Sequence, residues 1–169
     1  LLDTEHPDVA QGLNNLAFLL FENGDYAEAE PLYREALAIW RKTLPDGHPD
    51  IGNVLAGLGL VFIAIKAYVE AEPLLRESLA IREATLPEGH WARFGSMSAL
   101  GAALAGQGKY AEAESLLIDG YEGLKDQPQV AQKRKDLALQ RIIDLYDLWD
   151  RPESAARWRA ELSTMDQTD

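Results

Sequence analysis

Three histidines are the first residues of this sequence that suggest chemistry, because an imidazole can ligate a metal ion or act as a general base. His6, His48 and His90 stand at a constant offset of 42 residues. Residues that recur at one offset occupy equivalent places in successive units, and packed helices lie roughly 8 to 10 Å apart. Ligands of one zinc ion lie within about 4 Å of each other. We therefore predict no shared metal site, and expect each histidine to cap or pack at a corner of its unit.

Carboxylates are the second group that could do chemistry, since a close pair can serve as acid and base. Two sets of glutamates recur at the same offset, namely Glu28, Glu70 and Glu112, and Glu30, Glu72 and Glu114. A catalytic pair needs one special environment that separates two pKa values, whereas a repeated residue has a repeated structural role. We interpret these carboxylates as solvated residues in the first turns of helices, where the helix dipole favours them. No serine or threonine recurs beside a histidine, and no glycine-rich phosphate loop is present. The sequence predicts no catalytic residue, no metal and no cofactor.

The same offset relates much longer segments of the chain. Residues 44–48, LPDGH, recur at 86–90 as LPEGH, and residues 28–32, EAEPL, recur unchanged at 70–74. Within one unit, Leu13, Leu16 and Leu20 step by three and four, which predicts a first helix with one apolar stripe. A second helix is predicted to begin near Tyr26. The next first helix is predicted to open at residues 48–50, where a proline suits the first turn.

The turn between the two helices of a unit is marked by Gly24, which can adopt positive φ. Asp25 and Glu28 have the spacing of a capping box. Lys66 stands at the position that Gly24 and Gly108 hold in other units. We therefore expect either a different geometry or a left-handed strain at this second turn, and hence a locally altered corner.

Small residues stand where paired helices must approach closely. Ala17, Gly59 and Gly101 are equivalent on first helices, and this pattern predicts interlocking hairpins. A single hairpin cannot bury its apolar stripe, so stacked neighbours must complete the core. We predict an all-α, right-handed α-solenoid of about four 42-residue repeats, forming one array over residues 1–169. Its expected parts are repeats at 5–46, 47–88 and 89–127, a degenerate fourth repeat or cap at 128–162, and a polar tail at 163–169.

The repeated motif also resembles a known family. Residues 24–37, GDYAEAEPLYREAL, preceded by LNNLA at 13–17 and HPDVA at 6–10, are similar to the kinesin-light-chain class of tetratricopeptide repeat (TPR). The resemblance implies a protein-binding scaffold whose first helices line a concave groove. In that family an Asn pair like Asn14 and Asn15 helps to hold the backbone of a bound peptide. The equivalent pairs here are Ala56-Gly57 and Ser98-Ala99, so amide-mediated capture is expected only in the first unit.

Composition limits the classes of partner. The formal net charge of -12 disfavours nucleic acid, whose binding requires clustered Lys and Arg. The acidity is explained equally by solubility and by a preference for partners with basic residues. Cysteine is absent, and no apolar run approaches the roughly 20 residues that span a bilayer. The first residues lack a signal-type segment, so we expect a cytoplasmic protein that does not bind membranes. Leu2 aligns with Leu44, so we expect the chain to begin inside a repeat.

The favoured function is binding of a peptide or protein in the concave groove. An apolar partner side chain is expected near Phe18 and Phe21, and a basic one near Asp144 and Asp147. The alternative that Phe18 and Ile63 pack against neighbouring helices stays open. The groove is predicted to lack the cations with which co-chaperone repeats bind a terminal carboxylate. The predicted partner-binding residues are Gln11, Asn14, Asn15, Phe18, Phe21, Glu22, Asn53, Leu60, Ile63, Ser98, Gln140, Asp144 and Asp147.

An assembly role is the alternative function. Leu13, Leu16 and Leu20 could form an apolar N-terminal edge through which two copies associate. Arrays similar to this one also occur in bacteria as extensions of larger proteins. The chain could therefore serve as an oligomerisation or regulatory docking module of a signalling enzyme located upstream, such as a bacterial serine/threonine kinase.

Overall fold

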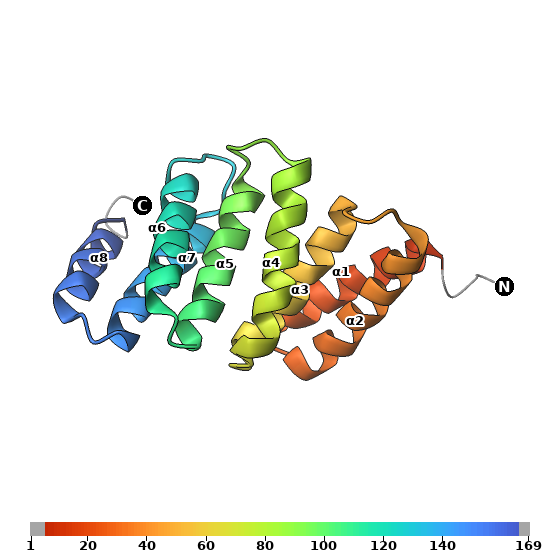
Figure 1. Cartoon of the computed structure of the whole chain (residues 1–169), viewed down its shortest axis with the longest axis horizontal. Coiled ribbons are helices and arrows are strands. Elements are labelled where there is room, and N and C mark those ends of the chain that lie inside the picture. Colours follow the sequence, from red (N-terminus) through yellow and green to blue (C-terminus); the bar gives the residue numbers. More distant parts are fainter. Residues whose placement is uncertain (1–5, 166–169) are drawn as a thin grey trace. The chain divides into compact units, whose positions relative to one another are not determined.

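The computed structural model describes residues 6–165, which form eight α-helices and no strand (Figure 1). The first three odd-numbered helices begin at Pro7, Pro49 and Trp91, which confirms the offset of 42 residues for them, and the fourth begins 41 residues later at Gln132. The helices are α1 (Pro7–Asn23), α2 (Tyr26–Thr43), α3 (Pro49–Ala64), α4 (Tyr68–Thr85), α5 (Trp91–Gly106), α6 (Tyr110–Lys125), α7 (Gln132–Leu148) and α8 (Pro152–Met165).

The chain divides into two compact units, Leu1–Pro87 and Glu88–Asp169. In unit 1, α1 pairs with α2 and α3 with α4, while α2 packs on α3 and α1 touches α3. In unit 2, α5 pairs with α6 and α7 with α8, while α6 packs on α7 and α5 also contacts α7. Each unit is therefore two stacked helical hairpins, as predicted for an all-α repeat protein.

The three histidines begin first helices as N-cap residues. Nδ1 of His6, His48 and His90 accepts the backbone N–H of the second residue that follows, each at 3.2 Å. The cap satisfies one of the N–H groups that lack a partner in the first turn. His90 also stacks on Trp91, with ring centroids 5.6 Å apart. The predicted capping role is confirmed.

The corner at Lys66 keeps the conformation of its equivalents, so the predicted left-handed conformation is confirmed and the expected altered geometry is wrong. Lys66 has φ 62°, beside 89° at Gly24 and 76° at Gly108. The Lys66 N–H donates to the Ile63 carbonyl at 3.0 Å, and the equivalent Gly24 N–H donates to that of Phe21 at 3.0 Å. Asp150 repeats the conformation with φ 56°. Backbone hydrogen bonding therefore holds this left-handed corner even where the residue is not glycine.

The capping box predicted at Asp25 does not form. Asp25 is the N-cap of α2, but its side chain makes no cap hydrogen bond. Its ψ of 59° lies outside the extended region from which an N-cap side chain reaches the first-turn N–H groups. Ala67 and Lys109 occupy the equivalent caps with ψ 63° and 56°.

The predicted close approach of small residues is confirmed within both units. A Cβ on Gly59 would lie 2.6 Å from Leu75, and one on Gly101 would lie 2.6 Å from Leu117. Around these contacts the core contains large side chains such as Tyr33 and Trp40, each 2% exposed. The hairpins are thus packed too closely to admit a larger residue at either glycine.

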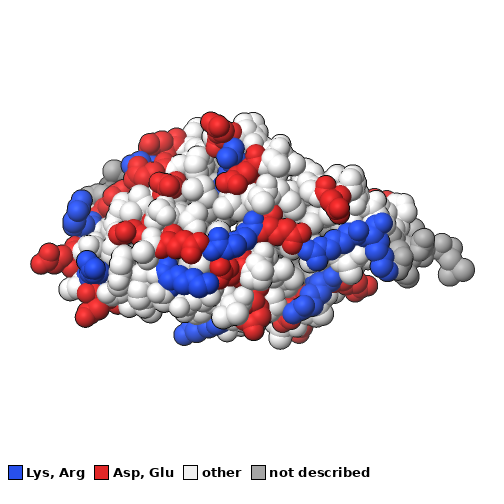
Figure 2. Space-filling view, in the orientation of Figure 1, with Lys and Arg blue, Asp and Glu red and all other residues white. Residues whose placement is uncertain are grey.

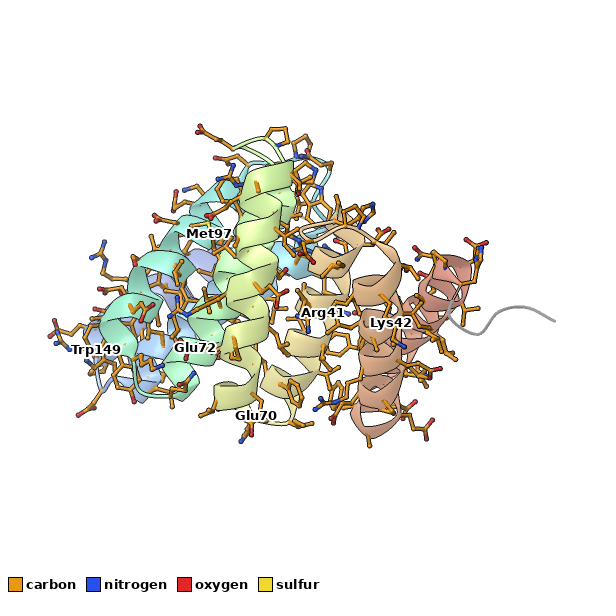
Figure 3. The ribbon with its side chains drawn as sticks, turned by 45° about the vertical axis from the view of Figure 1, so that its right-hand side comes forward. Arg41, Lys42, Glu70, Glu72, Met97 and Trp149 are labelled. Carbon is orange, nitrogen blue, oxygen red and sulfur yellow. The ribbon has the colours of Figure 1, made fainter. Side chains whose placement is uncertain are left out.

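Glu28, Glu70 and Glu112 lie in first turns of second helices, as predicted, whereas the prediction of solvated first-turn residues is wrong for Glu30, Glu72 and Glu114, which lie beyond the first turn and are half-buried. Glu28, Glu70 and Glu112 are exposed there, and Glu70 is labelled in Figure 3. Their neighbours two residues on in the first two units, Glu30 and Glu72, instead pair along the helix with arginines, at 3.0 and 2.8 Å. On the face drawn in Figure 2, basic and acidic side chains lie next to one another.

Two tyrosines fasten the last hairpin to the rest of unit 2. The Tyr146 hydroxyl donates to Glu114 Oε1 at 2.6 Å, which joins α7 to α6, and the Tyr121 hydroxyl donates to Glu161 Oε1 at 2.7 Å, which joins α6 to α8. These bonds help to explain how a diverged copy of the motif still folds in register. α8 continues to Met165, into the segment predicted as a polar tail. The prediction about Leu2 lies outside the described residues.

Over residues 6–165, no helix is both long enough and apolar enough to span a bilayer.

Candidate partner-binding surfaces

The first helices of unit 1 expose the residues predicted to contact a partner. We call this the unit 1 surface: Gln11, Asn14, Asn15, Phe18, Phe21 and Glu22 of α1 with Asn53, Leu60 and Ile63 of α3. Phe18 is 45% exposed. Phe21 is half-buried and packs against Tyr26, with ring centroids 5.6 Å apart. Leu60 and Ile63 are also half-buried. Phe18 is therefore the large apolar group that this surface offers most openly.

Amide groups surround Phe18 but are partly engaged with neighbours. Gln11 Nε2 donates to Asn15 Oδ1 at 2.8 Å, one turn along α1. Asn53 Oδ1 accepts from Arg82 Nη2 at 3.1 Å, which joins α3 to α4. A partner backbone that binds here must pair with the remaining donors and acceptors of these amides.

The first helices of unit 2 form a different surface. The predicted residues are Ser98 of α5 and Gln140, Asp144 and Asp147 of α7. Ser98 is only 1% exposed. It lies against Gly120 of α6, where an added Cβ would be 3.1 Å from Ser98 Cβ, and Arg141 Nη1 of α7 donates to Ser98 Oγ at 3.2 Å. Burial lowers the pKa of Arg141 to about 10, against the opposing effect of Asp144. Ser98 therefore lies beneath this surface.

The carboxylates of α7 are both in contact with other side chains. Gln140 Nε2 donates to Asp144 Oδ1 at 2.8 Å. Arg159 Nη2 of α8 contacts both carboxylate oxygens of Asp147, at 2.7 and 2.5 Å. Asp144 has no such cation bound to it in the described structure, so it is the more available of the two acidic groups.

Three residues of α7 that belong to the surface of unit 2 were not predicted from the sequence. Leu137 is 49% exposed, Leu148 is 56% exposed, and Arg141 lies between them on α7. They are equivalent to Gln11, Glu22 and Asn15 when the 42-residue offset is applied three times. That offset was the signal that could have found them. We define the unit 2 surface as Leu137, Gln140, Arg141, Asp144 and Leu148.

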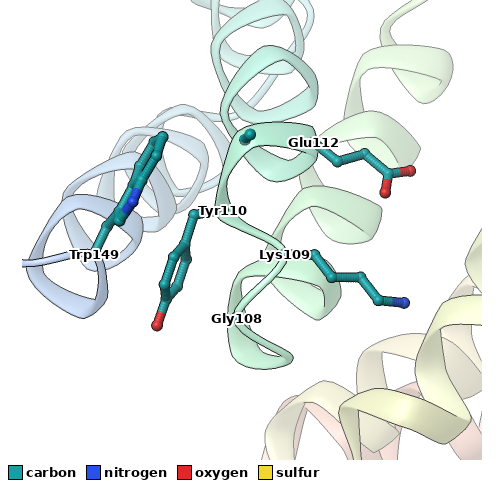
Figure 4. A pocket seen from close by; sticks show the side chains of 6 residues that line it. Gly108, Lys109, Tyr110, Glu112 and Trp149 are labelled. Carbon is teal, nitrogen blue, oxygen red and sulfur yellow. The ribbon is translucent and has the colours of Figure 1, made fainter.

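Each unit also has a shallow pocket beside an inter-helix turn. In unit 2 the pocket of about 340 Å³ is lined by Gly108, Lys109, Tyr110, Ala111, Glu112 and Trp149 (Figure 4). In unit 1 the pocket of about 410 Å³ is lined by the equivalent residues Gly24, Asp25, Tyr26, Ala27, Glu28 and Ile65. Since both occur at one place in the repeat, the pockets are a consequence of hairpin geometry.

Aromatic contacts close much of the unit 2 pocket. Trp149 stacks on Tyr110, with centroids 5.6 Å apart and ring planes at 26°. The Arg151 guanidinium lies 4.9 Å from the centroid of the same indole. These contacts stabilise the turn. Among the described residues no group of three or more His, Asp or Glu side chains is arranged to hold a metal ion.

Comparisons with known proteins agree with this architecture. One tetratricopeptide-repeat model matches residues 8–84, and another matches residues 94–123. No curated protein sequence matches the chain. Nearly identical TPR-like repeats assigned to a kinesin light chain of Podosopora anserina are 23% identical, with a TM-score of 0.77 over 96% of this chain and 77% of that one.

Two further solved structures share the fold. BtubC (BKLC) from P. vanneervenii is 14% identical with a TM-score of 0.81, covering 96% of this chain and 65% of that one. MamA of AMB-1 is 22% identical with a TM-score of 0.64, covering 99% and 83%. Since the two repeat models together match most of the chain, the chain belongs to the tetratricopeptide-repeat family, and its fold is similar to that of the kinesin-light-chain repeats named above.

Proposed function

We propose that this chain is a protein–protein interaction scaffold that binds a peptide or protein partner on the surfaces formed by its first helices. Tetratricopeptide repeats generally mediate protein–protein interactions and are typically non-enzymatic scaffolds. Helical repeat arrays bind partners along the extended concave surface that stacked repeats create. In this proposal the unit 1 surface and the unit 2 surface each contact part of the partner.

The observation that carries the proposal is a contrast between two sets of equivalent positions. Position 29 and its equivalents are all alanine and all 0% exposed. Position 18 and its equivalents are four different residues, of which Phe18 and Asp144 are exposed. Position 29 keeps one small residue because it is fully buried between closely packed helices, whereas the exposed positions equivalent to 18 have no such constraint and can differ with the part of the partner that each one meets. The positions equivalent to 29 are Ala29, Ala71, Ala113 and Ala155, and those equivalent to 18 are Phe18, Leu60, Ala102 and Asp144.

The two surfaces favour different parts of a partner. At Phe18 the surrounding amides suit an apolar side chain carried on a backbone that needs hydrogen bonds. On α7, Asp144 offers a carboxylate for a basic side chain. Arg141 lies one turn before it, so an acidic residue beside the basic one would also find a counter-charge. We propose Phe18 and Asp144 as the main contacts, in place of Phe21 and Asp147.

A peptide array tests the groove directly. We expect a set of sequences with one large apolar residue to bind the intact chain, and Phe18→Ala to weaken binding of that set at least tenfold, as loss of a central apolar anchor does. Asp144→Asn should weaken binding most for peptides with a basic residue. Val69→Ala is the matched control, because Val69 is 70% exposed but lies on α4, a second helix. Equal binding by Phe18→Ala and the control would contradict the proposal.

An assembly role is a second candidate, and one observation favours it. Leu16 and Leu19 of α1 are 48% and 63% exposed, on a face of the helix that differs from the unit 1 surface.

A further inference from the structure

The shallow pockets of the two units, the unit 1 pocket and the unit 2 pocket, differ in one wall. In unit 2 the C-cap residue of α7, Trp149, stacks on Tyr110 with ring centroids 5.6 Å apart (Figure 4). In unit 1 the equivalent wall is Ile65, the C-cap residue of α3. The isoleucine leaves a pocket of about 410 Å³, and the tryptophan leaves one of about 340 Å³. The unit 1 pocket therefore has no counterpart of the stacked indole.

The guanidinium that covers the indole in unit 2 has no counterpart in unit 1 either. Arg151 lies 4.9 Å from the indole centroid of Trp149, and the residue equivalent to Arg151 in unit 1 is Ala67. Residues 149–151, WDR, thus close the unit 2 pocket from within the chain. Residues 65–67, IKA, leave the unit 1 pocket open at the same place.

Both walls of the unit 1 pocket are apolar and accessible. Tyr26 packs against Phe21, with ring centroids 5.6 Å apart, and its side chain is half-buried. Across the pocket Ile65 is 47% exposed. The two walls belong to α2 and to the end of α3, which pack on each other. The residue at position 65, with both neighbouring helices present, is therefore what leaves the pocket open.

The rim of the unit 1 pocket is acidic. Asp25 and Glu28 line it and are exposed, and within the described structure no basic side chain lines it. Lys66 follows Ile65 but is not a lining residue. In the unit 2 pocket Lys109 takes the place of Asp25, so that rim carries both signs of charge. Carboxylates without a basic neighbour in the rim favour a ligand that brings its own positive charge.

We infer that the unit 1 pocket binds a segment of a partner protein in which a tryptophan lies close to an arginine or lysine. The indole of the partner stacks on Tyr26 as Trp149 stacks on its tyrosine in unit 2, and the basic group lies between the indole and the carboxylates of Asp25 and Glu28. Ring stacking and the cation–π contact both contribute to binding. This site is separate from the unit 1 surface and does not depend on peptide binding at Phe18.

Titration of the intact chain with the blocked peptide Gly-Trp-Gly-Arg-Gly, followed by NMR, tests the site. We expect saturable binding with upfield shifts of the indole signals, because the indole would lie over the Tyr26 ring. Gly-Leu-Gly-Arg-Gly keeps the charge and Gly-Trp-Gly-Gly-Gly keeps the ring, and each should bind at least tenfold more weakly. Absence of saturable binding, or equal binding by the leucine peptide, would overturn the inference.

A variant that closes the pocket from within locates the binding. Ile65→Trp combined with Ala67→Arg copies the two residues that close the unit 2 pocket, so the introduced indole should stack on Tyr26 and exclude the peptide. We expect at least tenfold weaker binding with helicity unchanged by circular dichroism. Ile65→Leu is the matched control and should bind as the unaltered chain does. A folded double variant that still binds the peptide normally would rule out this pocket as the site.

Two further variants separate the rim charges from the first-helix surface. Asp25→Asn combined with Glu28→Gln should weaken binding of the arginine peptide at least tenfold and remove its dependence on salt. The Asp25 side chain makes no cap hydrogen bond, so this change leaves the start of α2 intact. Phe18→Ala should leave binding of the peptide unchanged. Binding that ignores the rim variant, or that is lost in Phe18→Ala, would overturn the inference.

Discussion

Gly101 of α5 lies so close to Leu117 of α6 that an added Cβ would approach Leu117 Cγ to 2.6 Å. Leu117 is 0% exposed and has no room to move outward. We expect Gly101→Ala to lower the free energy of unfolding by about 1 to 3 kcal/mol, because the extra methyl overpacks the hairpin. Thermal and urea denaturation followed by circular dichroism would measure the change.

Gly95 is the matched control in the same helix. A Cβ there would meet nothing within 4 Å. Since alanine has a higher helix propensity than glycine, Gly95→Ala should stabilise the protein by up to about 1 kcal/mol. Opposite signs for the two variants would support close helix approach as the cause. Equal effects would mean that the spacing between α5 and α6 is not what excludes a side chain at position 101.

Replacement of Lys66 by glycine should stabilise the protein. The φ of Lys66, 62°, is left-handed, a conformation that costs most residues roughly 1 to 2 kcal/mol. Because glycine gains unfolded-state entropy, the expected net stabilisation of Lys66→Gly is about 0.5 to 1 kcal/mol. Lys66→Ile should destabilise, since a branched Cβ is least compatible with positive φ. Chemical denaturation of both variants and of the unaltered chain ranks their free energies of unfolding. A Lys66→Ile variant more stable than the unaltered chain would contradict backbone strain at this position.

The repeat and its helices were predictable because their signals are local and recur. The segments at residues 44–48 and 86–90, the tyrosines that begin second helices and the three histidines all share the 42-residue offset. So many matches at one offset fix the repeat length and the order of the helices. The geometry of single corners was less predictable. Spacing alone suggested a capping box at Asp25, but the ψ that prevents it is set by the backbone hydrogen bonds of the preceding corner, such as that from the Asp25 N–H to the Leu20 carbonyl at 2.9 Å.

The candidate surfaces were predicted less well for a different reason. Register shows which residues share a face, but long side chains decide which of them reach solvent. Ser98 is buried against Gly120 of α6 and accepts a hydrogen bond from Arg141 of α7, and Asp147 is paired with Arg159 of α8. Such contacts join residues that no short-range pattern relates. For Phe18 the pattern left open both exposure and packing against a neighbouring helix, and the structure leaves its side chain 45% exposed.

His48 should contribute to stability through its cap alone. Its Nδ1 accepts the Asp50 N–H at 3.2 Å, and loss of an N-cap acceptor costs about 1 kcal/mol. We expect His48→Ala to destabilise by that amount and His48→Asn to retain most of the stability, because an Asn side-chain oxygen can accept the same bond. Urea titration separates the two. Equal loss in both variants would show that the imidazole matters by packing.

The buried hydroxyl of Tyr33 should make the protein less stable at alkaline pH. Burial raises its pKa to about 12, with Glu22 adding to the effect, and the side chain is 2% exposed. Tyrosine in the unfolded chain has a pKa near 10. Above that pH the unfolded state releases a proton that the folded state retains, so the free energy of unfolding falls as pH rises from about 10 to 12. A difference of one in pKa corresponds to about 1.4 kcal/mol, so the loss attributable to Tyr33 reaches about 3 kcal/mol.

Tyr33→Phe keeps the ring and removes the ionisation, and it should therefore lose less stability over this range than the unaltered chain. Denaturation at a series of pH values, with tyrosinate absorbance recorded in parallel, makes the comparison, and identical pH profiles for the two proteins would show that Tyr33 ionises freely in the folded state.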